Sequence, residues 1–406
     1  MNKRLIIVAC SGALLLILIV VWIIFLTERK SALSLPVTKH TAAIVGNAEA
    51  KQREAGPPAA PVKSVGGLWV RPPAKVAARN VRRCRLGSTL RPFGASDSTL
   101  ERIADGDIQT AASELMQRAK AGDASAANQL GYIAHWTCGF ARIDGAQSAL
   151  HASEMRDAQG LAAADADWIR TAIVERETFN QQLSSVCQQS IDNGEVDAWV
   201  ATSASRGNME SHYALAMFGA RKERDAQLVA AAQGGVPWAQ FGLAQRILQG
   251  AAPASGISNT SENAKDLLNA AAVDLPQAES YLAQCEFRGC ADIPVDIPSA
   301  LTDARDAAER GEFDAMLEIG PQLQASQIDP DEVEAWSLIH AAIDVQGYAG
   351  NRISVAMVKS ASGTLNSPTV TSHAKALAEQ YWQEYGARIM TSLGCGGVVA
   401  ASGDKL

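Results

Sequence analysis

One pattern recurs five times along this chain in the same register. An alanine is followed three residues later by a turn residue and four residues after that by a small residue. An aliphatic residue lies four positions further on, and a Gly or Ala follows it directly. Residues three and four apart share one face of a helix, and Gly or Asp allows a helix to end in a tight turn. Each occurrence therefore predicts two antiparallel helices that approach closely. The defining positions are Ala119, Gly122 and Ala126; Ala204, Gly207 and Ser211; Ala232, Gly235 and Ala239; Ala271, Asp274 and Ala278; and Ala308, Gly311 and Ala315.

These repeats predict an all-α fold in which helix pairs stack into an α/α superhelical solenoid. The stretch 231–250, AAQGGVPWAQFGLAQRILQG, resembles the Sel1-like repeat family, a relative of the tetratricopeptide repeats. The resemblance extends in pieces over about residues 115–323 and implies a concave face used in protein–protein contacts. The 85-residue gap between Gly122 and Gly207 leaves room for a degenerate unit near Trp168 or for an insertion.

The amino-terminal region contains 22 uncharged residues, from Leu5 to Leu26. At about 1.5 Å per residue, a helix of this length spans a hydrocarbon core of about 30 Å. We expect residues 1–4 to be a cytoplasmic tail and 5–26 a transmembrane helix in a bacterial inner membrane, with the bulk of the chain in the periplasm. The alternatives are a cleaved signal peptide, which usually has a shorter apolar core, and lipidation at Cys10.

Residues 27–96 are predicted to be a disordered linker, since they are rich in Ala and Pro and contain two Pro-Pro pairs. Residues 1–96 carry 15 basic and 3 acidic side chains, a net +12, so the rest of a chain with net charge −7 carries −19. The basic linker has three interpretations: it packs on the acidic body, it lies at anionic lipid headgroups, or it binds nucleic acid. We expect no nucleic-acid partner, because only Trp69 and Phe93 interrupt the basic residues.

The remaining chain is predicted to contain a repeat region at 97–345, a helical cap at 346–395 and a flexible tail at 396–406. Asp329, followed by proline and two acids, is typical of a helix start. The segment 352–358 fits a strand or a helix equally well. The glycines that flank Cys395 suggest that this cysteine lies in an exposed tail.

Six cysteines follow the apolar stretch: Cys84, Cys138, Cys187, Cys285, Cys290 and Cys395. An even number outside the cytoplasm predicts at least one disulfide, although six cysteines allow fifteen full pairings. Cys285 and Cys290 are near enough in sequence to bridge across a helix end. The alternative is that most of these cysteines are small buried hydrophobes. A zinc site is not expected, because the chain contains no CxxC or HxxxH motif.

Two pairs of side chains, His135-Trp136 and His212-Tyr213, fall on second helices and are candidates for an interaction face, or else for half-buried packing positions. We find no nucleophile elbow, phosphate loop or dinucleotide motif, and we expect no catalytic residue, cofactor or metal. The predicted function is a non-catalytic scaffold that binds a protein partner at the inner membrane. The alternatives are a hydrolase or modifying enzyme of envelope polymers and a membrane-tethered folding chaperone.

Overall fold

The computed structural model describes residues 71–138, 152–161, 163–190, 193–251, 258–348 and 354–395. The chain divides into two compact units, Met1–Ala59 and Ala60–Leu406, and every described residue belongs to the second unit. The predicted cytoplasmic tail and transmembrane helix, most of the predicted linker and the tail 396–406 lie outside these residues. Among the residues that were searched, no helix is long and apolar enough to cross a membrane.

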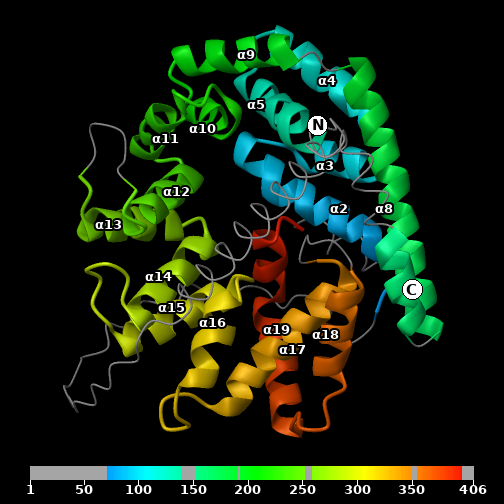
Figure 1. Cartoon of the computed structure of the whole chain (residues 1–406), viewed down its shortest axis with the longest axis vertical. Coiled ribbons are helices and arrows are strands. Elements are labelled where there is room, and N and C mark those ends of the chain that lie inside the picture. The colour runs from blue at the N-terminus through cyan, green and yellow to red at the C-terminus, as the bar shows by residue number, and fades with distance from the viewer. Residues whose placement is uncertain are drawn as a thin grey trace, which may run out of the picture. The chain divides into compact units, whose positions relative to one another are not determined.

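Within the described ranges the fold is all-helical, as predicted, and contains no β-strand (Figure 1). The α-helices are α2 (Ala74–Leu90), α3 (Asp97–Ala104), α4 (Ile108–Lys120), α5 (Ala124–Tyr132), α8 (Ala163–Ser190), α9 (Asn193–Ser205), α10 (Met209–Phe218), α11 (Arg224–Gln233), α12 (Pro237–Leu248), α13 (Ser261–Ala272), α14 (Pro276–Arg288), α15 (Ile297–Glu309), α16 (Asp314–Ile319), α17 (Pro330–Gln346), α18 (Val355–Leu365) and α19 (Ser372–Ser392). A π-helical turn, η2 (Ile133–Thr137), extends α5, and short 3-10 turns are η1 (Arg91–Phe93), η3 (Ala158–Gly160) and η4 (Gly320–Gln322). Of the segment 352–358, which fitted strand or helix equally well, residues 355–358 belong to α18, and residues 352 and 353 lie outside the described ranges.

The repeated pattern marks the turns between paired helices: α4 with α5, α9 with α10, α11 with α12, α13 with α14, and α15 with α16. Gly122, Gly207, Gly235 and Gly311 each have φ between 84° and 93°, a left-handed conformation that glycine adopts without steric cost. The residue after the turn often caps the second helix: Asn208, for example, accepts a hydrogen bond from the Ser211 amide at 2.8 Å. The small residues of the pattern are at most 5% exposed, so they form the seam of each pair.

The segment between the first two repeats is an insertion. Helix α5 packs directly on α9 and α10, so the two units are neighbours in the stack despite the gap in sequence. A buried polar link joins them, because the Ser211 hydroxyl donates to Asn128 at 2.8 Å and the Asn128 amide donates to Asn208 at 3.3 Å. The 28-residue helix α8 lies in this insertion and packs against α2 and α4.

The linker prediction is wrong for the segment that contains α2. The proline pair at 72–73 precedes this helix, where proline is tolerated, and does not prevent it. Its basic side chains pair with acids of the helical body: Arg79 with Asp105 and Arg83 with Asp97. The Arg79 guanidinium holds the pKa of Asp105 below its usual range, because it stabilises the carboxylate. Arg79 and Arg83 therefore face the protein itself, as the first of the three interpretations predicted.

The last helices of the unit return to its first helix. Helices α18 and α19 both pack on α17, and one continuous apolar core joins Cys84 of α2 with residues of α14 to α19. Figure 1 shows α2 beside the group formed by α17, α18 and α19. Gly347, which ends α17 with φ 78°, lies directly against the backbone of Ala77. The stack of helix pairs is therefore closed by contact between its two ends.

Candidate functional site

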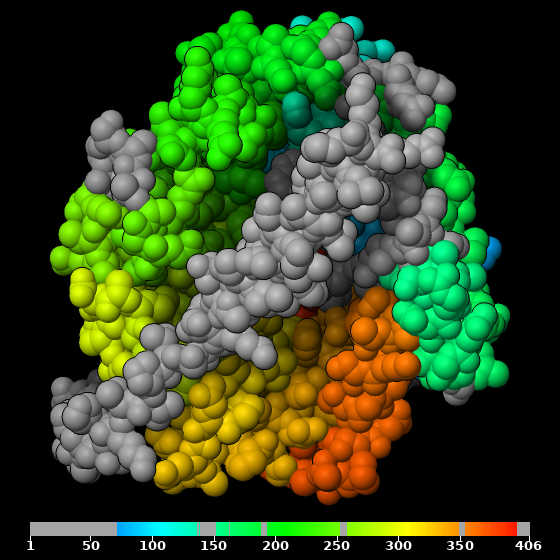
Figure 2. Space-filling model, in the orientation of Figure 1, coloured from blue at the N-terminus to red at the C-terminus, as the bar shows by residue number. Residues whose placement is uncertain are grey.

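A groove lies between the second helices of the second and third repeats. It is a cavity of about 240 Å³. Helix α10 contributes Tyr213, Ala216 and Met217, helix α11 contributes Leu228, and the α12 segment contributes Trp238, Gly242, Gln245, Arg246 and Gln249. The repeat explains this position, since each tight turn places the second helix of one unit beside that of the next. In Figure 2 the green region at the upper left, which contains α10, α11 and α12, is exposed on this face of the molecule.

The groove is hollow because its floor contains glycine. A Cβ atom built on Gly242 meets only the Leu228 Cδ1 atom, at 4.0 Å, within a 4 Å radius. Gly242 lies in the middle of α12, where glycine costs about 1 kcal/mol of helix stability relative to alanine. A chain with a larger residue at this position would fold at least as stably, but the added side chain would fill the cavity.

Aromatic rings line and extend the groove. Trp238 lies 6.3 Å from Phe241 between ring centroids, and Phe241 meets Tyr281 of α14 edge-on at 5.9 Å. Tyr213 stacks on Phe93 at 6.0 Å, and burial raises the pKa of Tyr213 to about 12, so its phenol stays neutral. Half-buried Trp and Tyr residues beside apolar side chains are typical of protein-binding hot spots, and Gln245, Arg246 and Gln249 add polar groups to the lining.

Of the three predicted interaction residues whose side chains are described, only Tyr213 lines the groove. His135 lies in η2, where its Nε2 atom is 2.6 Å from Asp197 and its ring stacks on Phe218. His212 points to Gln227, at 2.5 Å. The Trp136 side chain lies outside the described residues. Sequence reasoning missed Trp238, Met217 and Gly242, although Trp238 and Gly242 belong to the stretch with the clearest repeat pattern.

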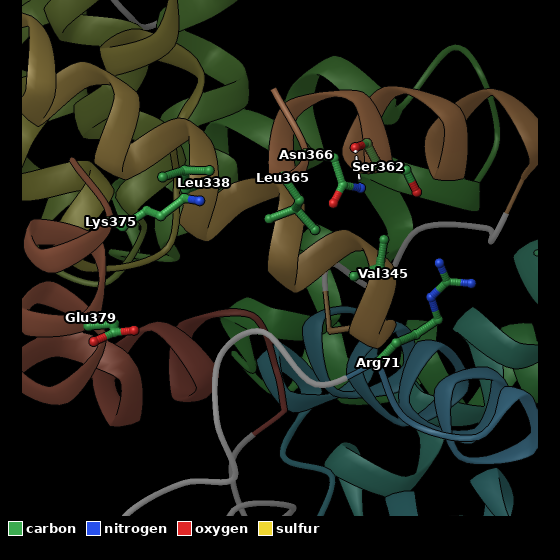
Figure 3. A pocket seen from close by; sticks show the side chains of 8 residues that line it. All are labelled: Arg71, Leu338, Val345, Ser362, Leu365, Asn366, Lys375 and Glu379. Carbon is green, nitrogen blue, oxygen red and sulfur yellow. Dashed lines mark hydrogen bonds between the residues drawn. The ribbon is translucent and has the colours of Figure 1, made fainter. Parts of the chain in front are cut away.

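A second cavity, of about 480 Å³, lies in the carboxyl-terminal cap (Figure 3). Its apolar lining comes from Leu338, Val345 and Leu365, and its rim includes Lys375 and Glu379. The lining also contains Arg71, Ser362 and Asn366. The guanidinium of Arg71 is already engaged, because it pairs with Asp165 at 2.7 Å and covers the Trp168 ring at 5.2 Å. This cavity mixes charges of both signs and shows no preference for one ligand.

Carboxylates gather where the fourth repeat meets the fifth. The Lys265 ammonium of α13 lies 2.7 Å from the buried Glu286 of α14. Burial, followed by the Glu286 and Glu279 carboxylates, raises the pKa of Asp303 in α15 to about 7. Burial also raises the pKa of Glu312, in the turn after α15, to about 7. Within the residues that were searched, no group of three or more His, Cys, Asp and Glu side chains has the arrangement of a metal site.

All six cysteines beyond the apolar stretch form disulfides: Cys84–Cys395, Cys138–Cys187 and Cys285–Cys290. The bridge predicted from sequence proximity is present at the end of α14. The expectation that Cys395 lies in an exposed tail is wrong, since it is fully buried and bonded to α2. The sequence offers no local signal for a pairing across 311 residues.

Comparison of the sequence with protein-family models and with curated proteins gives no match. Among solved structures, a Sel1 repeat protein from Oxalobacter formigenes is 19% identical, with a TM-score of 0.34, over 66% of this chain and 89% of that chain. The protein c5321, a protective antigen with an SLR fold from uropathogenic Escherichia coli strains, is 17% identical, with a TM-score of 0.38, over 72% of this chain and 70% of that one. Similarity at this level does not define the fold, which rests here on the turns and seams described above.

Proposed function

We propose that this chain is a non-catalytic scaffold that binds a protein partner in the groove between α10 and α12, tethered to the inner membrane and facing the periplasm. The observation that carries the binding proposal is the groove itself. It offers a hollow with a glycine floor, bordered by Trp238, Tyr213 and Met217, and it lies where two successive repeats meet. An apolar or aromatic side chain of a partner fits a hollow of this size and lining.

The three disulfides and the apolar stretch Leu5–Leu26 support the cellular placement. Disulfides form and persist in oxidising compartments such as the bacterial periplasm, and they are rare in the cytosol. A carboxyl-terminal alkaline phosphatase fusion tests this proposal. We expect activity in intact cells and retention in the membrane fraction, whereas an inactive fusion contradicts the orientation and a soluble mature chain contradicts the tether.

The Gly242→Leu substitution tests the groove. We expect it to reduce partner binding at least about tenfold, because the leucine side chain occupies the hollow, while thermal stability is unchanged or slightly raised. The measurement is photo-crosslinking in cells from a reactive residue placed at Gln249, on the rim of the groove. A partner bound there gives a crosslinked product that disappears in the Gly242→Leu protein.

Gly363→Leu provides the matched control. Gly363 is an exposed glycine within α18, and a Cβ atom built there meets nothing within 4 Å. The same substitution at this position should leave the crosslinked product unchanged. An equal product from the Gly242→Leu protein, or an equal loss in both variants, would contradict the assignment of the groove.

A further inference from the structure

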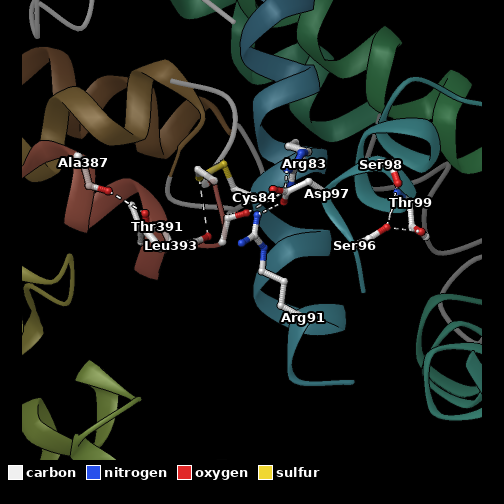
Figure 4. A network of polar contacts seen from close by, with 12 residues as sticks. Arg83, Cys84, Arg91, Ser96, Asp97, Ser98, Thr99, Ala387, Thr391 and Leu393 are labelled. Atoms are coloured by element: carbon white, nitrogen blue, oxygen red, sulfur yellow. Dashed lines mark hydrogen bonds and ion pairs between the residues drawn. A yellow bond between two sulfur atoms is a disulfide. The ribbon is translucent and has the colours of Figure 1, made fainter. Parts of the chain in front are cut away.

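The two ends of the helical unit meet in a junction that combines a covalent bond with close backbone contact (Figure 4). The Cys84–Cys395 disulfide joins α2 to the segment after α19. A Cβ atom built on Gly87 would overlap the Gly394 carbonyl oxygen, and one built on Gly394 would lie 2.7 Å from the Cys84 carbonyl oxygen. Only glycine at both positions lets the two backbones come this close.

Polar groups complete the junction. The fully buried Arg83 side chain reaches Asp97 at 3.0 Å and the Gly394 carbonyl oxygen at 3.5 Å. The buried Asn80 amide donates to the Gln346 carbonyl oxygen at 3.0 Å, which ties α2 to the end of α17. The apolar contact at α2 belongs to a cluster in which Ala74 and Ala77 lie with Ile169 and Ile173 of α8 and with Val355 and Val358 of α18.

The other two disulfides connect neighbouring parts of the chain. Cys285–Cys290 spans five residues at the end of α14, and Cys138–Cys187 closes 49 residues within the core shared by α5 and α8. The cross-link at the junction spans 311 residues. Because the entropy that a cross-link removes grows with the size of the loop it closes, this bond constrains the separation of the two ends most strongly.

We propose that the Cys84–Cys395 bond is a redox-sensitive clasp that holds the superhelix closed. A dithiol reductant transfers two electrons and two protons to the bond, so Cys84 and Cys395 become thiols and the reductant becomes a disulfide. Without the covalent bond, the remaining polar and apolar contacts of the junction hold the two ends less strongly, and α2 separates more readily from the segment after α19.

Both cysteines are fully buried, so a reductant gains access only when the carboxyl-terminal segment opens locally. The clasp is therefore expected to open slowly, and only under reducing conditions strong enough to hold it open.

Hydrogen–deuterium exchange of the full-length protein in detergent micelles tests the clasp. We compare oxidised protein, protein treated with dithiothreitol and alkylated, and the Cys84→Ser/Cys395→Ser variant. We expect amides of α2 and of the end of α19 to exchange about tenfold faster or more in the last two samples, while α11 and α12 change little. The serine variant should show no further change at α2 on reduction.

Two matched variants distinguish a specific role of the Cys84–Cys395 bond from a stabilisation that any of the disulfides would provide. Cys138→Ser/Cys187→Ser and Cys285→Ser/Cys290→Ser each remove one disulfide and should leave exchange at the α2 junction unchanged. The proposal is overturned if reduction leaves α2 protected, since the ends then stay together without the bond. It is also overturned if either control opens the junction equally, or if the Cys84→Ser/Cys395→Ser variant loses protection throughout the stack. These outcomes do not depend on partner binding in the groove.

Discussion

The Gly347→Ala substitution should destabilise the protein by about 3 kcal/mol or more, by two separate effects. Gly347 has φ 78°, a left-handed conformation that costs an L-residue about 1 to 2 kcal/mol. In addition, the new methyl group would overlap the carbonyl oxygen of Ala77 and lie 3.1 Å from Val81 of α2. Backbone cannot yield as a flexible side chain does, so α2 must shift away from the end of α17, at an overpacking cost of about 1 to 3 kcal/mol.

Gly235→Ala isolates the conformational part of this cost. Gly235 has φ 84°, close to that of Gly347, but a Cβ atom built there meets nothing within 4 Å. We expect this control to cost about 1 kcal/mol and to leave hydrogen exchange in α2 unchanged. Chemical unfolding gives the two free energies, and exchange at α2 shows whether the junction moved. Equal destabilisation by the two substitutions would mean that the close contact between the ends of the stack contributes nothing to the loss of stability in Gly347→Ala.

The helix pairs could be predicted from sequence because local chemistry determines them. A glycine that must adopt positive φ, a small residue on each side of it and a capping residue after it all lie within eight residues, as at Ala204, Gly207, Asn208 and Ser211. Each of these features acts without reference to the rest of the chain. The pattern therefore identified all five turns, including the one at Asp274, where the following Pro276 begins the second helix.

The closure of the stack could not be predicted in this way. Its contacts join residues 266 to 311 positions apart, such as Asn80 with Gln346 and Cys84 with Cys395. In sequence, the basic residues of α2 resemble those of a linker, because the acids that pair with them lie in α3, at its end and in α8. The proline pair at 72–73 suggests a linker in the sequence, but in the structure it directly precedes the helix.

The groove was only partly predictable for a related reason. The repeat pattern indicates which helix faces its neighbour, but it does not show which side chains leave a hollow between two units. The sequence indicates Tyr213 as an aromatic residue on a second helix. His135 is instead hydrogen-bonded to Asp197, and His212 to Gln227. The hollow depends on Gly242 in α12. The missing side chain of this glycine leaves a space only because Leu228 of the preceding helix lies opposite it, which the sequence alone does not show.

The Glu312→Gln substitution should stabilise the protein by about 3 kcal/mol at pH 8 and by less than about 1 kcal/mol at pH 5. Burial and the nearby Asp314 carboxylate raise the pKa of Glu312 from 4.5 in an unconstrained chain to about 7. Between these two values the folded state holds a proton that the unfolded chain has released, so this group's contribution to stability falls as the pH rises. Each unit of pKa difference corresponds to about 1.4 kcal/mol, and the contribution is fully lost above pH 7.

Glutamine removes this pH dependence and keeps an oxygen that can accept the weak hydrogen bond from the Asp314 amide, which is 3.4 Å long. The measurement is urea unfolding of both proteins at pH 5 and pH 8. Glu262→Gln, at an exposed position in the first turn of α13, is the matched control, and its difference from the unmodified protein should be the same at both pH values. If Glu312→Gln behaves like this control, then Glu312 is already ionised at pH 5, and burial at the turn between α15 and α16 does not hold its proton.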